Sequence, residues 1–238
     1  MAENENNPGA DTDLRPQATG QRTRPGNFVF FGTLVESSLV LVAWILGWLT
    51  GLWTWADLAA GFQQFPSPVS LGVGVLATLP MLALLVLVLH ASGRAFVRMR
   101  AFLEETLTPS IRDSSLVALL GLSLAAGLGE EWLFRGVLQA GLLQWGGGLP
   151  VPLAILIVGI IFGVCHWITP LYFLLATITG IYLGWLYWAT GSLVAPVLAH
   201  ALYDFIALVV IVRRQADPAV KQYPGGVEEA AGADAQPE

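Results

Sequence analysis

The chain is poor in charge and has a single cysteine. Of its 238 residues, 12% are charged and 55% are hydrophobic, whereas soluble domains contain about 25% charged residues. The lone Cys165 excludes an intramolecular disulfide and a metal site built from several thiolates. The lysines and arginines are few and scattered along the chain, so we expect no nucleic-acid partner.

Long apolar runs fill the middle of the chain. A helix of about 20 apolar residues crosses a bilayer. We therefore expect an all-α fold, a polytopic transmembrane helical bundle of about six spans in contact with membrane lipid. Short turns join the last three spans, so these should be neighbours in space. The expected spans are roughly residues 28–52, 70–90, 116–143, 150–166, 171–189 and 192–212.

The two ends of the chain differ from the middle. Residues 1–26 and 215–238 are polar, contain several Gly and Pro residues, and contribute most of the net charge of −6. Such segments lack the apolar surface that would offset the entropy lost on folding, so we expect disordered tails. The transmembrane domain should then occupy residues 27–214.

The basic residues predict how the spans are oriented. They lie before the first expected span and after the second and sixth, and positive charge favours the cytoplasmic side. Both tails should therefore be cytoplasmic, which requires an even number of spans. With no signal or transit peptide visible, the compact chain favours a prokaryotic plasma membrane. The basic residues outside the expected spans are Arg15, Arg22, Arg24, Arg94, Arg98, Arg100, Arg112, Arg213, Arg214 and Lys221.

The stretch between the second and third expected spans, residues 91–115, mixes charged and apolar residues. This pattern is typical of an amphipathic helix at the membrane interface. A solvated connector helix is an equally good interpretation.

Several ionisable residues fall inside the expected spans, where each costs a few kcal/mol and is usually functional or paired. Glu131 and Arg135 are four residues apart and can pair on one helical face. Glu130 points about 100° away from Glu131, so it is free to act elsewhere. The alternative is a buried ion network that braces two helices. The ionisable residues are Glu36, Glu130, Glu131, Arg135, His166, His200 and Asp204.

Two later spans supply histidines. His166 ends the fourth expected span, and His200 and Asp204 share a helical face in the sixth. Separately, these residues could be an interfacial histidine and a simple His–Asp hydrogen bond. Because neighbouring spans carry them, we predict that they converge with Glu130. At about 1.5 Å per residue, His166 falls nearer the cytoplasmic edge, so a tilted span or a break near Gly127 and Gly129 would be needed.

The motifs that carry these residues resemble those of the CAAX protease and bacteriocin-processing family, also called the Abi family. Its motifs are Glu-Glu-x-x-x-Arg, Phe-x-x-x-His and His-x-x-x-Asn/Asp, and all three occur here in order within a core of roughly residues 115–212. The matching segments are Glu130 to Arg135, Phe162 to His166 and His200 to Asp204.

The resemblance implies an intramembrane endopeptidase, a hydrolase that needs no metal cofactor. It implies that Glu130 activates water, that His166 holds this water, and that His200 and residue 204 stabilise the oxyanion. An ionised Asp204 only accepts hydrogen bonds, so we favour a role in orienting His200. The substrate would be a peptide or protein, with prenylated CAAX peptides as one possibility.

The same resemblance gives the remaining motif residues a supporting role: Glu131, Arg135 and Phe162. Glu130, His166 and His200 could alternatively bind zinc with an open position for water. A Cys165–His166 dyad is disfavoured because adjacent helical residues diverge by about 100°.

Non-enzymatic functions stay open as alternatives. A membrane scaffold, an immunity protein or a proton-coupled carrier could use the same polar cluster. Glu36 suits a proton relay better than a protease, although a helix-packing hydrogen bond would also explain it.

Overall fold

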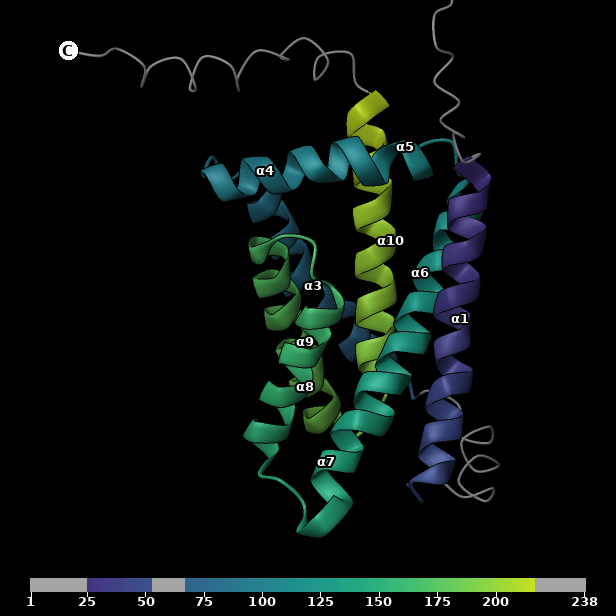
Figure 1. Ribbon diagram of the computed structural model, residues 1–238, viewed down its shortest axis with the longest axis vertical. Coiled ribbons are helices and arrows are strands. Elements are labelled where there is room, and N and C mark those ends of the chain that lie inside the picture. Colours follow the sequence, from purple (N-terminus) through teal and green to yellow (C-terminus); the bar gives the residue numbers. More distant parts are fainter. Residues whose placement is uncertain (1–24, 53–66, 217–238) are drawn as a thin grey trace, which may run out of the picture.

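The structure, a computed structural model, describes residues 25–52 and 67–216. All regular secondary structure within these residues is helical, as predicted. The predicted tail disorder falls on residues outside the described ranges. Figure 1 shows long helices side by side, with a shorter helical segment across one end.

Six helices correspond to the six expected spans. The third is extended beyond α6 by a π-helical segment, η2 (Trp132–Gln139), and by α7 (Ala140–Gln144). The central α10 packs against α3 and α6, while α1 packs on α6 and α8 on α9. The six helices are α1 (Pro25–Leu49), α3 (Pro68–His90), α6 (Leu116–Glu131), α8 (Val151–Cys165), α9 (Pro170–Thr190) and α10 (Val194–Ala216).

Five of these helical segments are long and apolar enough to cross a membrane, and α8 is not. It has 15 residues, about 22 Å at 1.5 Å per residue, against a hydrocarbon thickness of about 30 Å. The helix ends at Cys165, close to the expected bound, and His166 leaves the helical conformation with φ −102° and ψ 26°. The fourth expected span is therefore shorter than a full crossing.

Local sequence signals explain the ends of α9. The hydroxyl of Thr169 accepts a hydrogen bond from the Tyr172 N–H at 3.1 Å, and Pro170 occupies the first turn. Both are favourable at a helix start. Gly191 ends the helix in the left-handed conformation, with φ 62°. These caps fix the position of Tyr172 at the start of α9.

The segment after α3 forms α4 (Arg94–Phe102), a π-helical turn, η1 (Leu103–Leu107), and α5 (Thr108–Ile111). It lies across the end of the bundle where α1 begins and α10 ends (Figure 1). One guanidinium nitrogen of Arg100 donates to the carbonyls of Val88 and Ala91, both at 2.7 Å, and ties α4 to the end of α3.

A break near Gly127 and Gly129, one of the two ways considered to bring His166 to the depth of Glu130, does not occur, because α6 is regular through both residues. The glycines instead allow close helix packing. A Cβ on Gly127 would lie 2.9 Å from Cβ of Ala201 in α10, and a Cβ on Gly129 would clash with the carbonyl oxygen of Glu36 in α1. The glycines thus bring α6 against α1 and α10.

Candidate active site

Glu131 is fully buried and has two partners. Its Oε1 accepts a hydrogen bond from Nη1 of Arg135 at 3.0 Å and lies 2.9 Å from Nδ1 of His200. The side chains of Glu131 and Arg135 are both 0% exposed. The expected pairing of Glu131 with Arg135 therefore extends to α10, which sequence spacing did not indicate.

Arg135 also ties the π-helical segment to α9. Its Nη2 donates to the carbonyl of Gly180 at 2.8 Å, and Nε2 of Gln139 donates to the carbonyl of Gly184 at 2.9 Å. Sequence reasoning missed Gln139. Gln139 follows Arg135 by four residues, as Gly184 follows Gly180, and this equal spacing is the signal that could have identified Gln139. A π-helical segment inside a helix is often found at functional sites.

Glu130 points the other way and is much less engaged. Its Oε2 lies 3.6 Å from Nε2 of His166, and its side chain is only 10% exposed. This oxygen is buried without a hydrogen-bond partner in the structure. The two adjacent glutamates thus have different surroundings, with Glu131 anchored and Glu130 available.

His166 reaches Glu130 because it leaves the helical path at the end of α8. Its Nδ1 lies 2.8 Å from the carbonyl oxygen of Phe162. A carbonyl only accepts, so Nδ1 carries the hydrogen, and in the neutral ring Nε2 presents a lone pair toward Glu130. His166 and Glu130 therefore lie at the same depth, which the estimate of about 1.5 Å per residue did not predict.

Phe162 packs against each basic group of the site. Its ring stacks on His166 with centroids 4.4 Å apart and meets His200 edge to face at 6.0 Å. The guanidinium carbon of Arg135 lies 4.9 Å from the centre of the same ring, within the range of a cation–π contact. Phe162 is therefore a spacer between the histidines.

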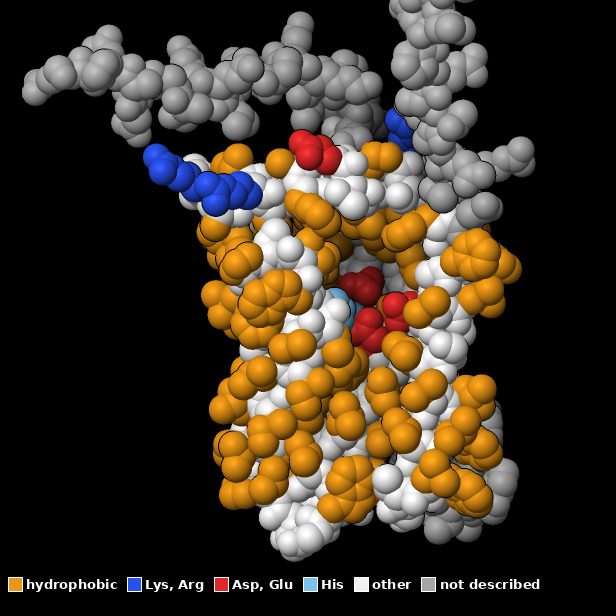
Figure 2. All heavy atoms as spheres, in the orientation of Figure 1, with side chains coloured by type: hydrophobic (Ala, Val, Ile, Leu, Met, Phe, Trp, Pro, Cys, Tyr) orange, Lys and Arg blue, Asp and Glu red, His pale blue; other side chains and the backbone are white. Residues whose placement is uncertain are grey.

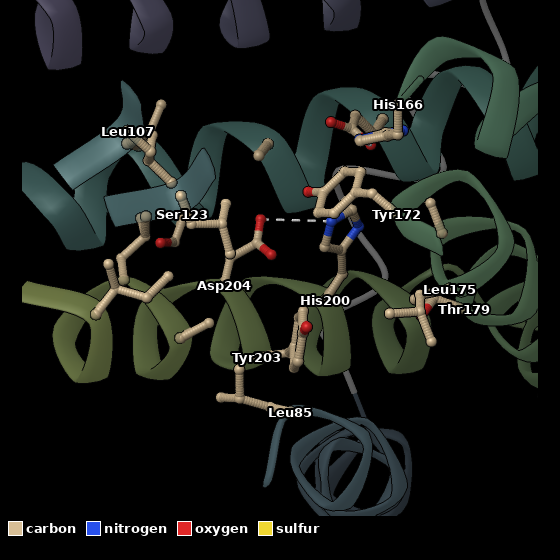
Figure 3. A pocket seen from close by; sticks show the side chains of 18 of the residues that line it. Leu85, Leu107, Ser123, His166, Tyr172, Leu175, Thr179, His200, Tyr203 and Asp204 are labelled. Carbon is tan, nitrogen blue, oxygen red and sulfur yellow. Dashed lines mark ion pairs between the residues drawn. The ribbon is translucent and has the colours of Figure 1, made fainter. Parts of the chain in front are cut away.

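His200 faces a carboxylate on each side of its ring. Nδ1 meets Glu131, and Nε2 lies 3.4 Å from Oδ2 of Asp204, the contact drawn as a dashed line in Figure 3. His200 is 6% exposed and Asp204 is 29% exposed. Asp204 is the carboxylate on the more accessible side.

A cavity of about 380 Å³ joins these side chains. Figure 2 shows acidic and histidine side chains within an opening in the side of the bundle, surrounded by apolar side chains. Its wall includes the four candidate catalytic residues and side chains that the motifs do not cover: Glu130, His166, His200, Asp204, Glu36, Ser123, Tyr172, Thr179 and Tyr203.

Glu36 and Tyr172 enter the cavity from outside the motifs. The Oε2 of Glu36 is buried without a hydrogen-bond partner, so this oxygen does not make the packing hydrogen bond that was one interpretation. Tyr172 gave no signal beyond its place one turn after a helix cap. Cys165 is exposed, so its thiol does not share the cavity with His166.

The geometry does not favour a zinc site. Among the described residues, no three His, Cys, Asp or Glu side chains are grouped as ligands of one metal ion. Within the set Glu130, His166 and His200, both nitrogens of His200 face carboxylates. The metal alternative stays a prediction that activity measurements can test.

Comparison with known proteins finds one family that matches part of the chain. The family described as type II CAAX prenyl endopeptidase Rce1-like matches residues 112–206, which include all four candidate catalytic residues. No curated protein and no solved structure is significantly similar to the chain. Five apolar helices and a family of membrane proteases indicate an integral membrane protein of the hydrolase class. The resemblance to the CAAX protease family is thus confirmed over residues 112–206.

Proposed function

We propose that this protein hydrolyses a peptide bond inside the membrane with a water molecule activated by Glu130. The observation that carries the proposal is the free carboxylate of Glu130, buried beside Nε2 of His166 in a shared cavity. A buried carboxylate oxygen that makes no hydrogen bond with the protein is available as a general base.

In the proposed reaction, one hydrogen of the water is accepted by Glu130 and the other by Nε2 of His166. The carboxylate removes the first proton while the water oxygen bonds to the carbonyl carbon, and the carbonyl electron pair moves to its oxygen. When that pair returns, the carbon–nitrogen bond breaks. Glu130 gives the proton to the leaving amine, so acid and base functions alternate on one group.

The remaining motif residues support this reaction. His200 lies on the side of the developing oxyanion, and Asp204 orients it through the 3.4 Å contact with Nε2. Glu131 and Arg135 hold the other side of the His200 ring. No metal ion takes part in this scheme.

The surroundings of the cavity favour a substrate that is embedded in lipid. Its opening in Figure 2 is rimmed by apolar side chains, and its wall toward α3 and α4 is apolar, including Leu85, Val88 and Met99. A peptide or protein with a membrane-embedded segment would enter from the bilayer, and a prenylated peptide is one member of that class. No nucleic-acid partner is proposed.

The proposed orientation puts α4 and both chain termini on the cytoplasmic side. Arg94, Arg98 and Arg112 belong to the segment across that end, and Arg213 and Arg214 lie in the last turn of α10 at the same end. This charge distribution fits the preference of positive residues for the cytoplasm. A prokaryotic plasma membrane is the proposed location.

The test compares wild type with Glu130→Gln in liposomes against membrane-tethered peptides, prenylated CAAX reporters included. The amide keeps the size of the side chain but cannot act as the base. We expect wild type to cleave at least one peptide and Glu130→Gln, with unchanged thermal unfolding, to cleave none. Equal cleavage by both proteins would refute the mechanism in which Glu130 is the base. A wild-type protein that cleaves no peptide would favour the alternative function as a membrane scaffold.

A further inference from the structure

The cavity has few groups that can donate a hydrogen bond to an oxyanion. Glu36, Glu130 and Asp204 are acceptors when ionised. The hydrogen on Nδ1 of His166 is committed to the Phe162 carbonyl. A hydrogen on Nε2 of His200 would be shared with Asp204 at 3.4 Å. The oxyanion therefore needs a donor without a competing acceptor.

Four hydroxyl groups line the cavity, and their positions differ. The hydroxyl of Ser123 donates to the carbonyl of Leu119 at 2.9 Å. In Figure 3, Thr179 is drawn at Leu175, away from Asp204, and Tyr203 is drawn between His200 and Leu85. Of the four, Tyr172 is the one whose ring is drawn directly beside the His200 ring in Figure 3.

Tyr172 lies beside both histidines. Its ring centroid is 6.4 Å from that of His166, and Figure 3 shows the ring next to His200 with its hydroxyl directed to the side where the Asp204 carboxyl lies. Its hydroxyl makes no hydrogen bond with the described residues; the only polar contact there is the backbone N–H to Thr169.

We propose that Tyr172 is a further catalytic residue, whose phenol O–H donates a hydrogen bond to the oxyanion of the tetrahedral intermediate. The inference rests on the proposed function. The phenol keeps its proton throughout, so the proton balance between water, Glu130 and the leaving amine is unchanged. The donor acts as the carbonyl oxygen gains charge and is released when the carbon–nitrogen bond breaks.

The position of Tyr172 suits this function because it is fixed before substrate binds. Thr169 caps the helix through the backbone N–H of Tyr172 at 3.1 Å, and Pro170 restricts the first turn. Donors held in place in this way stabilise charge without reorganisation during the reaction. The hydroxyl would also provide the donor that an ionised Asp204 cannot supply.

The test is Tyr172→Phe, assayed for kcat and KM with a peptide that wild type cleaves. Loss of one oxyanion donor lowers kcat about 10²- to 10³-fold, and KM should stay within about twofold because the ground state is little affected. Tyr187→Phe is the matched control, since it removes a hydroxyl from the same helix outside the cavity wall. It should keep the wild-type rate and thermal unfolding.

Several outcomes would overturn the inference. A Tyr172→Phe protein with the wild-type kcat would exclude the donor, and so would a change confined to KM. A loss of kcat in Tyr203→Phe instead of Tyr172→Phe would move the donor to α10. If Glu130→Gln abolishes cleavage while Tyr172→Phe does not, the inference about Tyr172 fails and the proposed function stands. A wild type that cleaves no peptide overturns both proposals.

Discussion

Oε1 of Glu131 lies 2.9 Å from Nδ1 of His200, although the two residues are 69 positions apart in the chain. The same oxygen accepts a hydrogen bond from Arg135 at 3.0 Å. One carboxylate thus fixes an imidazole of α10 against α6 and compensates a buried guanidinium. The buried Oε2 of the neighbouring Glu130 makes no hydrogen bond in the structure.

Glu131→Gln should destabilise the protein more than any other isosteric change in the site. The substitution leaves the guanidinium of Arg135, which is 0% exposed, without its counter-ion. Removal of one partner from a buried ion pair costs about 3–5 kcal/mol. Thermal unfolding in detergent should show a clearly lowered midpoint.

Glu130→Gln is the matched comparison for this stability prediction, because it changes the adjacent residue in the same way. It should lose activity while its midpoint stays near that of wild type. Equal midpoints for the two variants would show that the Glu131 network contributes little to folding.

Asp204→Asn should retain activity. Asp204 contacts Nε2 of His200 at 3.4 Å and is 29% exposed, while the buried Glu131 holds the other ring nitrogen. An amide can still orient the imidazole through its oxygen. We expect kcat/KM within about tenfold of wild type, equal to a change below about 1.4 kcal/mol. Complete loss in a normally folded variant would mean that the charge of Asp204 is required.

Gly129→Ala should weaken the packing of α1 on α6. The added Cβ would clash with the Glu36 carbonyl oxygen and lie 3.1 Å from Cβ of Leu39. Overpacking of this kind costs about 1–3 kcal/mol. Gly121→Ala is the control on the same helix, since its Cβ meets nothing within 4 Å. Gly129→Ala should unfold at a lower temperature than Gly121→Ala. Similar unfolding midpoints would show that α1 shifts away from the added Cβ without loss of stability.

Removal of divalent metal should leave cleavage unchanged. Both nitrogens of His200 face carboxylates, so the set Glu130, His166 and His200 offers no clear three-ligand geometry for zinc. The measurement is peptide cleavage after dialysis against a chelator. Loss of activity that added zinc restores would establish the metal mechanism in place of the glutamate mechanism.

Spacing within one helix predicted the local contacts of the site. Glu131 with Arg135, and His200 with Asp204, are four residues apart and do meet. The link from Glu131 to His200 was not predictable, because it depends on how α6 and α10 rotate about their own axes. Helix periodicity fixes which residues share a face but leaves that rotation open.

The bounds of α8, Val151–Cys165, are close to the expected span of residues 150–166. What the sequence pattern did not show is where the side chain of His166 points. Its Nδ1 lies 2.8 Å from the Phe162 carbonyl oxygen and its Nε2 lies 3.6 Å from Glu130, an arrangement that depends on the backbone conformation at the end of α8. Tyr172 was missed for a similar reason, since the turn that follows decides where it points.

The contacts of Phe162 affect how substitutions in this protein will combine. One ring meets His166, His200 and Arg135, so a change to any of them alters the packing of the others. Residues in direct contact give non-additive free energies, with coupling of about 0.5–3 kcal/mol. The losses measured for single variants of this cluster should therefore not sum to the loss in a double variant, and double-mutant cycles through Phe162 are the way to divide them.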